Sequence, residues 1–246
     1  MSLSSAGNIF SNEFAPTAVD SRIHYPCYKS LDRYIDLKTL RSLDGYIAER
    51  INHQIKTRDA DYFVNLHRLE ENSPYQPGVR EIWLSRTRPE LPEECLDLVG
   101  ETRFWEPTEA AEDFVLLMDF IETLPFQTTG RMIIFYDDAG RAVPAHRDHL
   151  DAELCQEFIW FRTNLKKPFY VLNEQTGEKK YVESYSAWFD SVNQFHGSDA
   201  AQKGLTFSVR VDGKFTDEFR NQIPQPEFNA ASTPAFWACR NHNCLW

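Results

Sequence analysis

Val143-Pro-Ala-His146-Arg-Asp148 is the stretch of sequence that decides how the rest of the chain is interpreted. It places an imidazole and a carboxylate two positions apart, and the period-2 geometry of a strand points both side chains to the same face. A second imidazole, His196, follows after a series of short apolar and aromatic runs that are typical of strands. If these strands return to the same place, two imidazoles and one carboxylate can converge on one metal ion.

Two histidines and one carboxylate are the facial triad of non-haem Fe(II) oxygenases, which leaves open positions on the metal. The same donors also build catalytic zinc sites, so the ligands alone leave zinc as an alternative. Arg210 favours iron because it lies in a predicted strand, residues 205–211, that follows His196. Its guanidinium fork suits the far carboxylate of a dicarboxylic cosubstrate whose 2-oxo acid end chelates the metal.

With these residues in this order, the stretch 130–213 resembles the core of the Fe(II)/2-oxoglutarate-dependent oxygenases. His146 and Asp148 match the H-x-D motif of that family, His196 its distal histidine, and Arg210 its 2-oxoglutarate arginine. The resemblance implies an α+β, mainly β fold: a double-stranded β-helix, similar to a jelly roll or cupin, buttressed by N-terminal helices. It also implies Fe(II) as the metal and 2-oxoglutarate as the cosubstrate.

Hydrophobic patterning divides a single predicted domain, residues 1–246, into three parts. Residues 1–129 are expected to form an extended arm, a flanking strand and two helical stretches, one capped by Ser30 and running to Ile55 and one opened by Pro107. Residues 130–213 contain about eight short predicted strands. Residues 214–246 form a tail whose Cys239-Arg-Asn-His-Asn-Cys244 run offers too few ligands, too closely spaced, for a structural zinc site.

Composition limits the classes of function. Apolar residues at 42% and aromatic residues at 14% supply ample material for a core. The formal net charge of −11 argues against general binding to nucleic acid or to anionic membranes. There is no long apolar run and no secretory signal pattern, and the five cysteines are scattered. These features favour a cytoplasmic protein with reduced thiols.

The resemblance implies that 2-oxoglutarate is decarboxylated to succinate while O2 oxidises a substrate. Related halogenases carry a small residue in place of the carboxylate ligand, so Asp148 favours hydroxylation, although desaturation, cyclisation and demethylation use the same triad. We expect a small-molecule substrate such as a free amino acid. The alternatives are a peptide or protein side chain, a cupin-type metal enzyme that does not use 2-oxoglutarate, and a β-barrel binding module whose metal is structural or absent.

Several further side chains are candidates for contact with cosubstrate or substrate. Tyr136 and Arg131 lie on the predicted strand before the H-x-D motif and are the first candidates for cosubstrate binding. The others lie beside the metal motif, on the strand that follows it, or between the flanking strand and Pro89: Arg147 and His149, Arg162 and Asn164, and Arg86 and Arg88.

Overall fold

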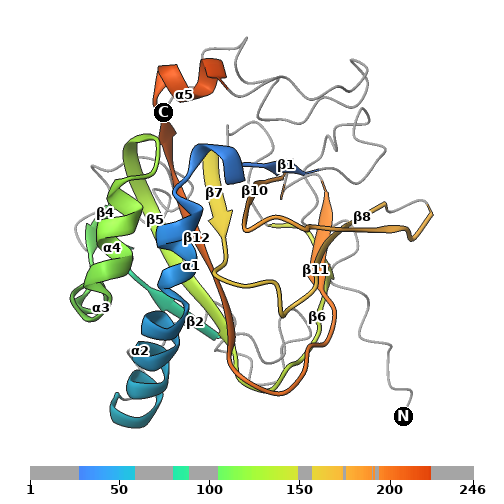
Figure 1. Cartoon of the computed structure of the whole chain (residues 1–246), viewed down its shortest axis with the longest axis horizontal. Helices are drawn as coiled ribbons and strands as arrows, with labels where there is room; N and C mark the ends of the chain where they lie inside the picture. The colour runs from blue at the N-terminus through green and yellow to red at the C-terminus, as the bar shows by residue number, and fades with distance from the viewer. Residues whose placement is uncertain are drawn as a thin grey trace, which may run out of the picture.

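The computed structural model of the chain describes residues 28–58, 80–88, 105–148, 157–173, 176–189, 191 and 194–222. The N-terminal arm, His149, the cysteines and the tail beyond residue 222 lie outside the described residues. Two antiparallel sheets dominate the described part, and helices pack beside one of them (Figure 1). None of the described helices combines the length and the apolar character needed to span a membrane.

The larger sheet, here called the major sheet, has six strands in the order β1-β10-β7-β12-β5-β2. Their bounds are Lys29–Ser30 for β1, Ser186–Trp188 for β10, Glu157–Phe161 for β7, Thr206–Phe215 for β12, Phe126–Asp137 for β5 and Arg80–Trp83 for β2. The long β5–β12 pair is its centre: Arg210 lies opposite Ile133, and Thr206 lies opposite Asp137. A separate two-stranded sheet joins β3, Ser85–Thr87, to β4, Trp105–Pro107.

The smaller sheet, here called the minor sheet, has the order β6-β11-β8-β9. Its strands are β6, Val143–His146; β11, Phe195–Ser198; β8, Phe169–Leu172; and β9, Lys179–Tyr181. From β5 to β12 the chain alternates between the two sheets, apart from the β8–β9 hairpin within the minor sheet. Eight strands that alternate between two facing sheets form a jelly roll, which is the double-stranded β-helix expected from the sequence. The strands extend over residues 126–215, slightly beyond the predicted core.

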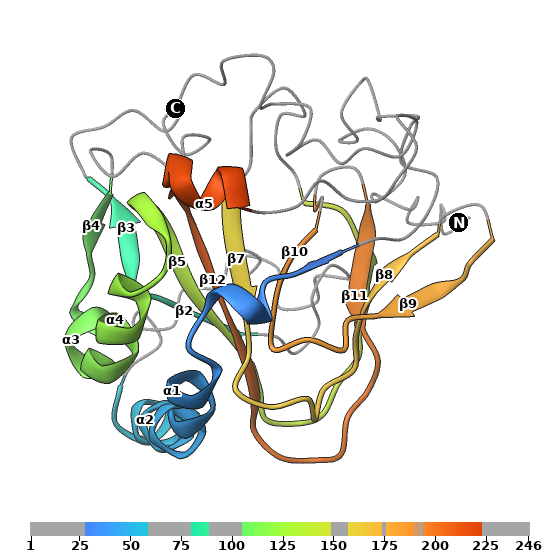
Figure 2. The same ribbon diagram turned by 45° about the horizontal axis from the view of Figure 1, so that its top comes forward.

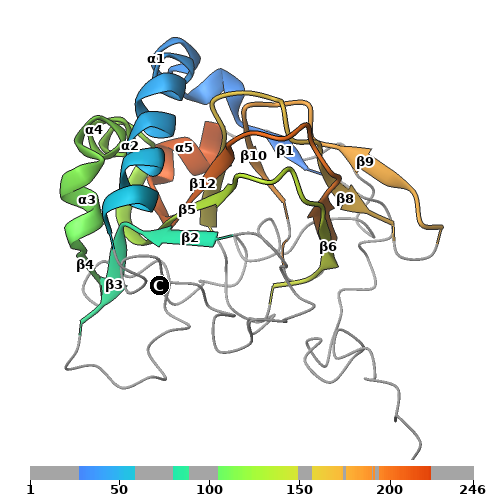
Figure 3. The same cartoon turned by 90° about the horizontal axis from the view of Figure 1, so that it is seen from below.

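Helices lie on the side of the major sheet that faces away from the minor sheet (Figures 1 and 2), and the view from below shows the same separation (Figure 3). The N-terminal group contains a 3₁₀ turn at Asp32–Tyr34, α1 at Leu37–Ser42 and α2 at Asp44–Thr57; α3 at Glu109–Asp113 and α4 at Val115–Glu122 pack beside it, and α5 spans Asp217–Gln222. Phe120 of α4 contacts Phe161 of β7 edge to face, with ring centroids 5.5 Å apart. The helices therefore buttress the sheet, as the sequence predicted.

Two predicted helix starts are wrong. Ser30 belongs to β1 and pairs with Ala187, because the edge strand β10 offers hydrogen-bond partners to the backbone of β1. The N-cap of α1 is instead Asp36, whose carboxylate accepts from the backbone N–H groups of Lys38 and Thr39 at 3.0 and 3.1 Å. Pro107 ends β4 rather than opening a helix, and the following helical stretch is broken at Phe114.

Strand β7 explains how the core and the cavity share one sheet. Alternate residues of a strand face opposite sides, and all five residues of β7 are buried. Phe161 faces the helices through Phe120, whereas Trp160 lines a cavity between the two sheets. The apolar run therefore predicts a strand that is buried on both faces. One face of β7 packs against the helices, and the other face contributes to the wall of the cavity.

Candidate metal centre

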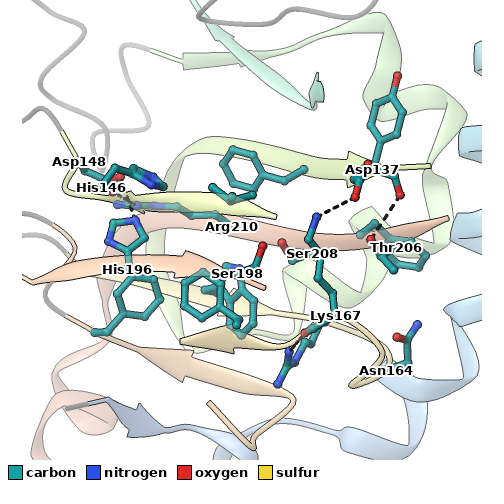
Figure 4. Close-up of a pocket in the computed structure, with 18 residues that line it drawn as sticks. Asp137, His146, Asp148, Asn164, Lys167, His196, Ser198, Thr206, Ser208 and Arg210 are labelled. Atoms are coloured by element: carbon teal, nitrogen blue, oxygen red, sulfur yellow. Dashed lines mark hydrogen bonds and ion pairs between the residues drawn. The ribbon is translucent and has the colours of Figure 1, made fainter. Parts of the chain in front are cut away.

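His146, Asp148 and His196 come together at one end of the cavity between the sheets. His146 is the last residue of β6 and lies opposite His196 of β11, with ring centroids 4.4 Å apart. One potential ligand atom from each of the three residues lies within 4.8 Å of the others. Figure 4 shows the three side chains gathered at this end. The structure thus juxtaposes the predicted triad, while metal binding itself stays a prediction.

Asp148 lies two residues beyond His146, after β6 has ended. Its backbone N–H donates to the carbonyl of Ser191 at 2.8 Å, which fixes the segment after the strand. The H-x-D spacing therefore brings both side chains to the site, although the strand itself stops at the histidine.

Backbone carbonyls orient both imidazoles. Nδ1 of His146 lies 2.9 Å from the carbonyl oxygen of Pro144, and Nδ1 of His196 lies 3.2 Å from that of Gln194. A carbonyl oxygen can only accept a hydrogen bond, so each Nδ1 is assigned as the protonated donor. In a neutral ring this assignment leaves Nε2 with the lone pair that a metal ion requires. Nε2 of His196 lies 3.4 Å from Oδ1 of Asp148.

The two oxygens of Asp148 have different partners. Oδ1 faces His196, whereas Oδ2 accepts a hydrogen bond from Nη1 of Arg210. Burial raises the pKa of this carboxyl, but the Arg210 guanidinium and the two imidazoles outweigh it and hold the pKa of Asp148 well below its usual range. Asp148 is therefore an ionised carboxylate with one oxygen directed toward His196 and the other held by Arg210.

Arg210 is enclosed by carboxylates. Its Nε donates to Asp212 at 3.0 and 3.2 Å, and its Nη2 lies 2.9 Å from Oδ1 of the same residue. Asp212 is 1% exposed and also accepts from Nε of Arg131 at 3.0 Å. The guanidinium of Arg210 stacks over Phe158, 4.0 Å from the ring centroid. Burial lowers the pKa of Arg210, but Asp212 and Asp148 reverse this and raise it. Arg210 is thus a charged group whose Nε and Nη1 donate to carboxylates, while its Nη2 lies near Asp212 without a hydrogen bond.

The cavity extends from the triad between the two sheets. Aromatic side chains form a large part of its walls: Phe135, Trp160, Phe169, Phe189 and Phe207. Hydroxyl groups of Ser198, Thr206 and Ser208 also line it. Ser198 is 3% exposed, and its Oγ has no hydrogen-bond partner among the described residues. Buried hydroxyl groups are normally paired, so this one marks a place where a polar ligand group fits.

Charged groups lie at the far end of the cavity as well (Figure 4). Nζ of Lys167 lies 2.9 Å from Oδ2 of Asp137, whose carboxylate also accepts from the backbone N–H groups of Ala139 and Arg141. Arg162 donates to three backbone carbonyls, those of Ser184, Lys167 and Val182. Burial lowers the pKa of Arg162 to about 10. It makes no ion pair within the described part of the chain, so its positive charge is compensated only at longer range.

The other predicted contact residues have varied positions. Tyr136 lines the cavity, and burial raises the pKa of its phenol despite an opposing hydrogen bond from Arg80. Arg131 is not a cavity-lining residue and pairs with Asp212. Asn164 lines the cavity while donating to Asp44 at 2.7 Å. Arg147 stacks over Phe195 at 4.3 Å, and Arg86 pairs with Glu106 at 2.9 Å in the β3–β4 sheet.

Sequence reasoning missed Lys167, Asp137 and Ser198. Lys167 lies in the turn before β8, beside Lys166 and Pro168, and such a turn is typical of a solvated surface. Asp137 ends β5 and is followed by Asp138, Ala139 and Gly140, a composition that is typical of a turn. Ser198 is two residues after His196, and the period-2 rule alone would have placed its hydroxyl on the face of the metal ligand.

Comparison with known proteins gives solved structures only. No family model and no curated protein matches the chain. A prolyl-4-hydroxylase from Pseudomonas putida aligns with a TM-score of 0.43 and 11% identity, over 80% of this chain and 96% of that chain. AviO1 from Streptomyces viridochromogenes gives a TM-score of 0.43 and 13% identity, over 82% and 96%. Dioxygenase for auxin oxidation 1 from Arabidopsis thaliana, in a 2-oxoglutarate complex, aligns with a TM-score of 0.42 and 11% identity, over 81% of this chain and 86% of that chain. We base the function below on the side chains of the site rather than on these distant likenesses.

Proposed function

We propose that the protein is an Fe(II)- and 2-oxoglutarate-dependent dioxygenase. The observation that carries the proposal is the convergence of His146, Asp148 and His196, with ligand atoms within 4.8 Å, at one end of a buried cavity. Two imidazoles and one carboxylate leave metal positions open for a cosubstrate and O2. Among the described residues no fourth histidine, cysteine or carboxylate joins the group, which favours a catalytic site over a closed structural one.

The residues present fit the proposed metal. Both histidines direct Nε2 away from their carbonyl partners, and Asp148 keeps Oδ1 beside His196 while Arg210 holds Oδ2. One carboxylate oxygen is therefore available as a ligand without a change in the contacts of the other. When bound, iron with 2-oxoglutarate and O2 would supply oxidising chemistry that yields succinate, CO2 and an oxidised substrate.

The contribution of this chain to such a reaction is placement. The paired strands β6 and β11 fix the two histidines, and carbonyl contacts fix their ring orientation. Aromatic side chains in the cavity beside the triad lower the local polarity, which strengthens the interactions of charged groups there. Serine and threonine hydroxyls and buried cations in the same cavity suit a ligand with carboxylate ends.

Hydroxylation is the proposed outcome because the carboxylate ligand Asp148 is retained. A small molecule such as a free amino acid is the proposed substrate, and a peptide or protein side chain is the alternative. A metal enzyme that does not use 2-oxoglutarate would keep the triad but would not require a second subsite that binds a distal carboxylate. The buried cations at the far end of the cavity therefore favour the 2-oxoglutarate reading.

Succinate formation tests the proposal. Protein loaded with Fe(II) without oxygen is given 2-oxoglutarate, O2 and a panel of amino acids, and succinate is measured. We expect turnover in the wild type and none above background in His196→Ala. The matched control is His53→Ala, which removes an exposed histidine of α2. Equal succinate from the wild type and His196→Ala would overturn the proposal.

A further inference from the structure

Arg210 is held in place by two carboxylates of the protein, Asp148 and Asp212. Nε donates to Asp212 and Nη1 donates to Asp148, while Nη2 lies 2.9 Å from Oδ1 of Asp212 as an ion-pair contact and makes no hydrogen bond among the described residues. Turning this guanidinium toward a cosubstrate would leave Asp212, which is 1% exposed, with only Arg131 as an ion-pair partner. Removing a partner from a buried carboxylate destabilises the folded protein. Two of the three nitrogens of the predicted anchor therefore already donate to carboxylates of the protein.

Lys167 has capacity to spare. An ammonium group carries three donors, and the side chain of Lys167 has one acceptor among the described residues, Oδ2 of Asp137. Asp137 is 1% exposed in its side chain, and two backbone N–H groups fix it. The carboxylate thus holds the ammonium at the cavity wall and leaves two N–H groups for another acceptor.

The positions of these groups along the strands suit the length of 2-oxoglutarate. The carbon chain of this molecule has four C–C bonds of about 1.5 Å, which span about 5 Å in a zigzag. His196 and Ser198 are two residues apart on β11, or about 6.6 Å at 3.3 Å per residue. Ser198 and Lys167 both lie beyond the triad along the cavity (Figure 4). A molecule chelated at the triad can therefore direct its far end toward them.

The charged residues that line the far end of the cavity are two cations, Lys167 and Arg162, and one carboxylate, Asp137. The Lys167–Asp137 pair is neutral as a unit, and Arg162 adds a buried guanidinium that makes no ion pair within the described residues. An incoming carboxylate would compensate this charge and would accept hydrogen bonds from Lys167 and from the unpaired hydroxyl of Ser198. Charge-assisted hydrogen bonds of this kind are the stronger ones.

We propose that Lys167, together with Ser198, binds the distal carboxylate of 2-oxoglutarate, and that Arg210 is a positioning residue for Asp148. The inference rests on the proposed function, because it assigns residues to the cosubstrate of that reaction. It differs from the assignment that the sequence motif suggests, in which Arg210 binds the carboxylate.

Equilibrium binding to the Mn(II)-loaded protein, measured by calorimetry without turnover, separates the two assignments. The two probes are 2-oxoglutarate and 2-oxopentanoate, which has the same five-carbon chain and the same chelating end but a methyl group in place of the distal carboxylate. The ratio of their dissociation constants measures recognition of that carboxylate alone. Loss of a hydrogen bond to a charged group corresponds to a change of roughly 10- to 100-fold.

We expect the wild type to prefer 2-oxoglutarate by roughly that factor, and Lys167→Met to bind both probes with dissociation constants within about threefold of each other. Lys166→Met removes an exposed neighbouring lysine and should keep the preference. Arg210→Met should also keep it, because a disturbed Asp148 affects both probes alike. Ser198→Ala deletes a hydroxyl group that has no partner among the described residues, so this variant should fold normally. It should reduce the preference for 2-oxoglutarate about tenfold. It serves as the second test if Lys167→Met is unstable.

A preference that survives in both Lys167→Met and Ser198→Ala but disappears in Arg210→Met would overturn the inference and leave the proposed function intact. A wild-type protein that binds Mn(II) but not 2-oxoglutarate would refute the proposed function itself. The two failures are therefore distinguishable within the same experiment.

Discussion

Asp212→Asn should destabilise the protein substantially, because Asp212 joins Arg131 and Arg210 in a buried ion-pair network behind the triad. The carboxylate is 1% exposed and lies within 3.0 Å of both guanidinium groups. Removing one partner of a buried ion pair costs about 3–5 kcal/mol. We expect the lower end, about 3 kcal/mol, because Arg210 keeps Asp148 and Arg131 is 14% exposed and can be hydrated.

Thermal unfolding followed by circular dichroism measures this loss. For a chain of this size 1 kcal/mol corresponds to about 2–4 °C, so the Tm should fall by roughly 6–12 °C. The matched control is Asp217→Asn, which also removes a carboxylate from an arginine, Arg220, but at a side chain that is 87% exposed. An exposed pair contributes less than about 1 kcal/mol. Equal shifts in the two variants would refute the claim that the buried network stabilises the site.

Two further predictions concern backbone packing and helix capping. Gly197→Ala should weaken Mn(II) binding about tenfold or more, as measured by calorimetry. The added Cβ would lie 2.6 Å from the carbonyl oxygen of Val143 and would push β6, which carries His146, away from β11. The control is Gly45→Ala, where nothing lies within 4 Å of the added Cβ, and this variant should bind the metal normally. Unchanged metal affinity in Gly197→Ala would show that the strand spacing does not set the site. The Asp36 cap should give an acid-dependent contribution: hydrogen bonds from Thr39 lower the pKa of its carboxyl from 3.8, so the stability advantage over Asp36→Asn is present above pH 3.8 and disappears as the pH falls through the lowered value. Chemical denaturation at several pH values measures it, and a pH-independent difference would contradict the assigned cause.

The sequence predicted the parts of the site that depend on local periodicity. The apolar runs between Arg131 and Val211 indicated strands, and the H-x-D spacing with His196 predicted that the three side chains meet. The jelly roll itself was implied by the family resemblance that these residues carry. Such patterns are informative because alternation along a strand determines which face a side chain occupies.

Other features depend on contacts between distant segments, which no local pattern carries. Ser30 resembles an N-cap, but it pairs with β10, more than 150 residues later in the chain. Arg210 lies where the motif predicts, yet its partners Asp148 and Asp212 are set by the packing of β12 against the segment after β6. Lys167 resembles a surface lysine until Asp137, at the end of β5, is placed beside it.

The most direct test of the central claim is anaerobic absorption spectroscopy of the Fe(II)-loaded protein during titration with 2-oxoglutarate. Chelation of Fe(II) by a 2-oxo acid produces a visible metal-to-ligand charge-transfer band. The triad His146, Asp148 and His196 predicts such a band in the wild type and in His53→Ala, and its absence in His196→Ala. No band in the wild type, or an equal band in His196→Ala, would contradict the assignment of this triad as the site where iron and 2-oxoglutarate bind.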